Sequence, residues 1–132
     1  MTTQSAWVYD ESFKAAADLS AKQYYAVELT AADTVDAAGA AADTIIGVLM
    51  NKPKLGQAAT VRCLGIAPCV SDGSGTAIAV GDRVGPNSSG KMVKKATADY
   101  AVAGIAMDAS SADGTVIRVF LTPGAYFRSA GG

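Results

Sequence analysis

Turn signals recur roughly every eight to twelve residues along most of this chain, and this spacing constrains its fold more than any other feature. Short runs rich in β-branched and apolar residues lie between the turns, and no long amphipathic helix separates them. The predicted strands are residues 24–30, 44–50, 58–66, 77–80, 100–107 and 115–122. The pattern is typical of a mainly β protein, an antiparallel sandwich or a small barrel.

Two of the predicted strands alternate clearly between apolar and polar positions, as half-buried strands do. Their predicted inward faces are Tyr25, Val27 and Leu29 in the first and Ile117, Val119 and Leu121 in the second. The small and polar residues 31–43 between strands read instead as a loop or a poor short helix. The length of 132 residues fits one domain, which we place at residues 23–132.

Residues 1–22 differ from the rest and are interpreted as an N-terminal arm. Residues 11–21 could form a helix capped by Asp10, or the segment could be extended. Three aromatic residues, Trp7, Tyr9 and Phe13, fall close together here. They either cover their own domain or act as anchors on a partner.

A second candidate contact lies near the C-terminus, after the Pro123-Gly124 turn signal. Its residues are Tyr126, Phe127 and Arg128. The alternative interpretation is a frayed terminus without a partner.

Charge and hydropathy exclude two classes of partner. The net charge is −1, from 11 basic and 12 acidic residues, so no basic field is available to hold a phosphate backbone. No segment reaches the roughly 18 consecutive apolar residues of a membrane helix, and the N-terminus does not resemble a signal peptide. We therefore expect neither nucleic acid nor membrane as a partner.

Residues suited to catalysis are scarce. The chain has no histidine, which removes the commonest general base and metal ligand. Gly73-Ser74-Gly75 lacks the lysine and helix that follow a phosphate-binding loop, and a serine–lysine dyad remains only a formal alternative. We expect no enzyme activity, no metal and no cofactor.

The two cysteines, Cys63 and Cys69, are too few for a disulfide-rich scaffold. They read as two buried small hydrophobic residues, with an internal disulfide as the alternative. Pro68 fits badly in a regular strand, so the pair is expected to flank a bend.

A weak internal similarity links two parts of the chain. Residues 46–51 (IGVLMN) resemble residues 103–108 (AGIAMD), and each is followed by a loop, a glycine and a strand with an arginine, at Arg62 and Arg118. Two similar hairpins could form two sides of one barrel, although chance similarity between apolar strands is an alternative.

Three segments between Ile45 and Leu121 carry a recognisable order of turn and strand signals: IIGVLMNKPKLGQAATVRCLG, AIAVGDRVGPNSSGK and YAVAGIAMDASSADGTVIRVFL. This order resembles a family of phage head decoration proteins, also called capsid cement proteins. The matching positions are Gly47, Gly56, Ala58, Gly81, Asp82, Val84, Gly90, Gly104, Ala106 and Leu121. Residues 1–22 and 31–43 are less like the pattern.

The resemblance implies a compact β-barrel or β-tulip-like domain in the virion, on the outer surface of the capsid. It also implies binding to the major capsid protein of the expanded head, commonly as homotrimers that bridge neighbouring subunits. Two other readings stay open: another virion component, such as a tail-tube or head–tail joining protein, or a small ligand- or carbohydrate-binding barrel.

Overall fold

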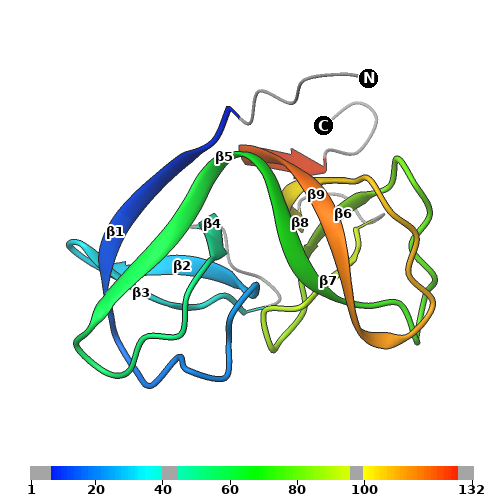
Figure 1. Ribbon diagram of the computed structural model, residues 1–132. Coiled ribbons are helices and arrows are strands. Elements are labelled where there is room, and N and C mark those ends of the chain that lie inside the picture. The colour runs from blue at the N-terminus through cyan, green and yellow to red at the C-terminus, as the bar shows by residue number, and fades with distance from the viewer. Residues whose placement is uncertain (1–6, 40–44, 96–99, 128–132) are drawn as a thin grey trace, which may run out of the picture.

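The computed structural model describes residues 7–39, 45–95 and 100–127, and these residues form strands and connecting turns without a helix (Figure 1). The predicted mainly β barrel class is confirmed. The strands are β1 (Tyr9–Ala15), β2 (Ala26–Ala31), β3 (Thr34–Ala37), β4 (Ile45–Leu49), β5 (Ala58–Asp72), β6 (Arg83–Pro86), β7 (Met92–Lys94), β8 (Tyr100–Ala106) and β9 (Asp113–Phe127). The described part of the chain has no helix of the length and apolarity that crossing a membrane requires.

The strand pairings close into two five-stranded rings that share β5 (Figure 1). The first barrel runs β1–β3–β2–β4–β5 and returns to β1. The second runs β5–β7–β6–β8–β9 and returns to β5, where a single pair, Ser71 with Met92, joins β5 to β7. Closed rings leave few unpaired strand edges.

The shared strand β5 bends between its two halves, as Figure 1 shows. Up to Leu64 it pairs with β1, and from Gly65 onward it pairs with β9. Gly65 has φ +98°, a left-handed conformation that glycine adopts without steric cost. The expected bend between Cys63 and Cys69 is therefore present, but it falls at the glycine and β5 continues through Pro68.

The two barrels repeat one topology in the same chain order. The strands β1, β2, β3 and β4 correspond to the second half of β5, β6, β7 and β8, and the first half of β5 corresponds to β9. Each barrel has one parallel pairing, β1–β3 or β5–β7, and its other pairings are antiparallel. The parallel pairs align Ala15 with Val35 and Ser71 with Met92, and all four residues are fully buried.

The internal similarity seen in the sequence thus marks a structural repeat, but the two hairpins lie in two barrels and not on two sides of one. A Cβ atom on Gly47 would lie 2.1 Å from the carbonyl oxygen of Arg62, and one on Gly104 would lie 2.2 Å from that of Phe120. The structure therefore aligns Arg62 with Phe120, two residues away from the Arg118 that the sequence comparison suggested.

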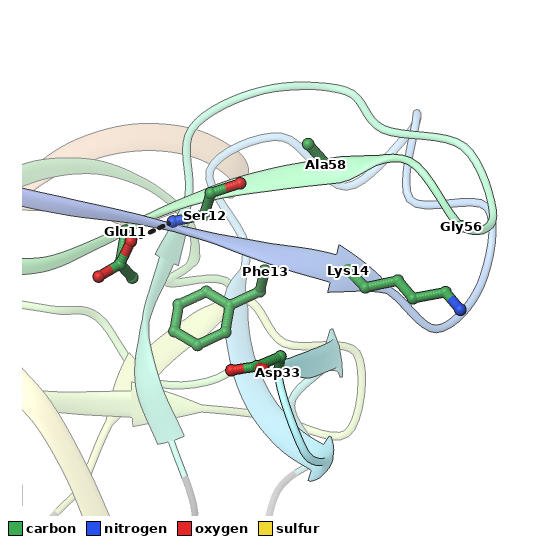
Figure 2. A pocket seen from close by; sticks show the side chains of 7 residues that line it. All are labelled: Glu11, Ser12, Phe13, Lys14, Asp33, Gly56 and Ala58. Atoms are coloured by element: carbon green, nitrogen blue, oxygen red, sulfur yellow. Dashed lines mark hydrogen bonds between the residues drawn. The ribbon is translucent and has the colours of Figure 1, made fainter.

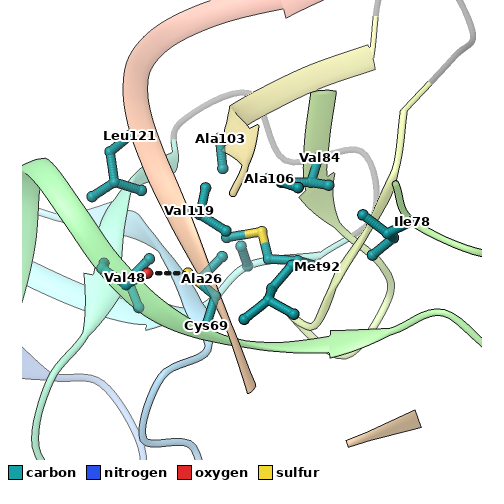
Figure 3. Close-up of a cluster of buried hydrophobic side chains, with 13 residues drawn as sticks. Ala26, Val48, Cys69, Ile78, Val84, Met92, Ala103, Ala106, Val119 and Leu121 are labelled. Carbon is teal, nitrogen blue, oxygen red and sulfur yellow. Dashed lines mark hydrogen bonds between the residues drawn. The ribbon is translucent and has the colours of Figure 1, made fainter. Parts of the chain in front are cut away.

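Two clusters of buried side chains fill the molecule. The larger one draws on both barrels: Ala26 and Val48 of the first pack with Cys69, Met92 and Val119 of the second (Figure 3). The smaller one lies inside the first barrel and consists of Ala15, Leu19, Val27, Val35, Leu49, Ala59 and Val61.

Of the two alternatives for residues 11–21, the extended one is realised: residues 9–15 form the strand β1, and residues 16–21 contain no helix. Two other local expectations were wrong. Part of the expected loop 31–43 is the strand β3, which is held between β1 and β2. The expected strand 77–80 is reduced to one isolated bridge between Ile78 and Ser110.

Candidate interaction surface

The segment before β1 crosses the outside of the shared strand at its bend. A Cβ atom on Gly65 would lie 2.5 Å from the carbonyl oxygen of Trp7 and 2.9 Å from a methyl group of Val8. Only a glycine lets the two backbones approach this closely. The Trp7 side chain is 86% exposed.

Tyr9 is half exposed and tied to its own strand. Its hydroxyl donates a hydrogen bond of 2.5 Å to Oε2 of Glu11, and the backbone N–H of Ser12 donates to Oε1 of the same carboxylate at 3.0 Å. The bond between the two side chains raises the pKa of Tyr9 and lowers that of Glu11. The carboxylate thus accepts a hydrogen bond from a backbone N–H on a stretch of β1 that pairs with β5 on one side. It thereby satisfies a donor on the strand edge that does not pair with β5.

Phe13 takes the opposite role from Trp7. It is partly buried and packs against the cluster inside the first barrel. Its ring borders an open hollow, whose other lining residues are Glu11, Ser12, Lys14, Asp33, Gly56 and Ala58 (Figure 2). The three aromatic residues of the N-terminal segment therefore separate: Phe13 covers its own barrel, whereas Trp7 and Tyr9 face outward.

The C-terminal candidates continue the last strand. The backbones of Tyr126 and Phe127 belong to β9 and pair with Ala101 and Tyr100 of β8. The expectation of a frayed end is wrong for these two residues. Arg128 lies outside the described residues.

Neither cysteine is placed for chemistry. Both are free, so the alternative of an internal disulfide is not realised. Cys69 is fully buried, which agrees with the expected small hydrophobic role, whereas Cys63 is only partly buried. Burial raises the pKa of both thiols and disfavours the reactive thiolate. The described residues contain no group of three or more His, Cys, Asp or Glu side chains that could hold a metal ion.

An exposed apolar surface on the second barrel escaped the sequence analysis. On β5 and β9, Ile66 lies opposite Phe120, and Val70 lies opposite Val116. The exposed fractions are 42% for Ile66, 50% for Phe120 and 52% for Val116. We call Ile66, Pro68, Val70, Val116, Arg118 and Phe120 the outer face. The alternation of residues 115–122 carried the signal, because the positions between the inward residues are also largely apolar.

The one charged side chain of the outer face is neutralised within the chain. Arg118 donates from Nε to Oδ2 of Asp108 at 3.0 Å and from Nη2 to Oδ1 at 2.8 Å. The backbone N–H of Arg118 donates to Oδ2 of the same carboxylate at 2.9 Å. These bonds lower the pKa of Asp108 to about 2, so both partners are charged at neutral pH.

The family of this chain follows from its similarity to known proteins. A family model described as phage cement protein matches residues 11–121, which is most of the chain. This chain belongs to the phage cement protein family. The predicted structural role in the phage head is therefore confirmed, and the place of this cement protein is in the virion, at the capsid.

A solved structure shows the same fold. The crystal structure of the N base of the head fiber gp8.5 of bacteriophage phi29 matches this cement protein with a TM-score of 0.67. The match covers 89% of this chain and 96% of that chain, at 16% sequence identity. A search of curated proteins finds no match. The similarity to the head fiber base thus lies in the arrangement of strands, while few side chains are shared.

Proposed function

We propose that this cement protein binds the outer surface of the expanded phage capsid and bridges neighbouring major capsid subunits, with its copies associated as trimers. The observation that carries the proposal is the exposed side chain of Trp7, which is 86% exposed on a backbone that lies against Gly65. A large aromatic side chain on an ordered backbone loses little conformational freedom on binding, and such residues dominate many protein interfaces.

The segment around Trp7 is suited to an anchoring role because its backbone lies against Gly65 at the bend of β5. Tyr9 and Leu64 are aligned across β1 and β5, and both are about half exposed. Together with Trp7 they make an apolar area where the two barrels meet. Tyr126 and Phe127 are a proposed second contact, supported by the course of β9, which passes Gly65 at Leu121 before reaching them.

A protein that binds the expanded shell and not its precursor stabilises the expanded shell by mass action. Each contact can be modest, because many copies act on one shell and each bridges several subunits. Nothing in this mechanism requires a reactive group. The absence of histidine and the suppressed reactivity of both thiols are compatible with it.

The proposal is tested with expanded capsids that lack this protein. A chain without residues 2–8 keeps β1 intact, so it should fold as the full chain does. In co-sedimentation with capsids, its affinity should fall at least about tenfold. Leu55→Ser is the control, because Leu55 is 68% exposed and its neighbour Gly56 bonds to Ala15, at the opposite end of β1 from Trp7. Unchanged binding by the truncated chain would show that the segment is not the anchor, and failure of the full chain to bind capsids would refute the proposed function.

A further inference from the structure

The repeat lets each surface position of one barrel be compared with its counterpart on the other. Asp10 lies opposite Arg62 across β1 and β5, and at the equivalent place Ile66 lies opposite Phe120 across β5 and β9. In the first barrel these residues form an ion pair, with 2.9 Å between Nε of Arg62 and Oδ1 of Asp10. The fold therefore accepts polar residues at this position.

The neighbouring cross-strand pairs are also more polar in the first barrel than in the second. The first barrel has Ser12 opposite Thr60 and Lys14 opposite Ala58. The second has Pro68 opposite Arg118 and Val70 opposite Val116. Since both barrels share one geometry, strand pairing does not demand the apolar residues of the outer face, and something other than folding accounts for them.

We propose that the outer face of the second barrel is the surface through which copies of this chain contact one another. The inference deepens the proposed function, on whose self-association it rests, by naming the surface involved. Identical faces that approach one another repel least when each carries no net charge. Arg118 satisfies this condition, because Asp108 holds its guanidinium through two hydrogen bonds. The whole chain has a net charge of only −1, so its copies repel one another weakly.

The size of the outer face sets the expected affinity of the copies for one another. Its exposed apolar area is on the order of 300 Å², the size of patch that marks interaction sites on monomers. A standard interface buries about 800 Å² per partner. The face therefore suits the apolar centre of a weak interface, with self-association in solution in roughly the micromolar to millimolar range.

The first barrel supplies the substitution that tests the proposal. The double variant I66D/F120R gives the outer face the Asp–Arg arrangement that the fold already tolerates between Asp10 and Arg62. Sedimentation velocity of the full chain should show concentration-dependent association. The variant should associate at least about tenfold more weakly while its thermal unfolding stays cooperative.

A matched control comes from another exposed valine. Val116→Thr should weaken association, whereas Val80→Thr, the same chemical change at a 69% exposed side chain, should leave it unchanged. If I66D/F120R does not fold, V116T/F120T takes its place, because threonine keeps a high strand propensity.

The outcomes separate the inference from the proposed function. A full chain that stays monomeric at its highest soluble concentration, or variants that associate as the full chain does, would overturn the inference. So would variants that associate normally but no longer co-sediment with capsids, because the face would then contact the capsid. A chain that associates through the outer face yet binds no capsid would sustain the inference and refute the proposed function.

Discussion

Gly47 lies directly against the backbone of Arg62, where an added Cβ atom would come within 2.1 Å of the carbonyl oxygen. Gly104 stands in the same relationship to Phe120, at 2.2 Å. Backbone cannot move aside as the tip of a side chain can. These two contacts let β4 approach β5, and β8 approach β9, closely enough to close each barrel.

Replacing either glycine should therefore destabilise the fold to a similar degree. We expect Gly47→Ala and Gly104→Ala each to lower the free energy of unfolding by about 3 kcal/mol, measured by urea denaturation. Gly75→Ala is the control, because no atom lies within 4 Å of its added Cβ. A large loss at one site and none at the other would contradict the structural equivalence of the two barrels.

The exposed tryptophan can be observed directly, because it is the only one in the chain. In the free protein Trp7 should emit as a water-exposed indole and be readily quenched by iodide. Capsid binding should shift the emission to shorter wavelength and protect the indole, since an apolar contact replaces water. Emission that stays unchanged in the bound state would show that Trp7 takes no part in the contact.

The two cysteines should react in a fixed order. At mildly alkaline pH a thiol reagent should modify Cys63 slowly and Cys69 only after unfolding, because burial raises the pKa of both thiols and Cys69 is fully buried. Mass spectrometry of the labelled native chain reads the order, and the urea-unfolded chain supplies the control in which both react at once. Rapid labelling of Cys69 in the native chain would contradict this packing.

Acid should weaken the fold in part through Asp108. Its pKa of about 2 in the folded chain lies below its ordinary value of 3.8. The carboxylate therefore contributes stability above about pH 4, and this contribution is lost as the pH falls towards 2. Asp108→Asn should show a smaller difference in unfolding free energy between about pH 6 and pH 2 than the parent chain. An equal difference in the two proteins would exclude Asp108 as a source. Glu11, Asp18 and Asp72 also have lowered pKa values, so the dependence should shrink and not vanish.

Sequence patterns predicted the strands whose stability is local. Residues 45–49 and 100–106 combine β-branched and apolar residues between clear turns, and both form strands where expected. The strand β3 was missed because its sequence, TVDA, is short and combines two residues that favour strands with Asp and Ala, which are depleted in them. It exists because β1 and β2 pair with it on either side, an effect that no local pattern can show.

Pro68 shows a second limit of local reasoning. A proline inside a strand is tolerated where its missing N–H would not face the partner strand. Opposite it, Arg118 directs its backbone groups away from β5: its N–H donates to Asp108, and its carbonyl oxygen accepts from Met107. The pair is thus one of those that exchange no hydrogen bonds, and β5 continues through Pro68.

The candidate surface was predicted only in part. Aromatic residues near the N-terminus drew attention correctly to Trp7 and Tyr9, but composition could not show that Phe13 turns inward. The outer face was missed because the alternation of residues 115–122 was used to assign the inward side chains, and no role was assigned to the side chains between them. Recognising that Val116 and Phe120 are exposed requires knowing that nothing in the described chain covers the other side of β9.

The sharing of β5 has a consequence for how the molecule fails. Each barrel uses one half of this strand as a wall, and the larger buried cluster draws on both barrels, so we expect the two barrels to unfold in one cooperative transition. A copy bound to a capsid would then be either folded or unfolded, without a partly unfolded form that stays at its site. The resistance of a decorated capsid to heat or shear would accordingly depend on the number of folded copies bound to it, and not on partial unfolding within each copy.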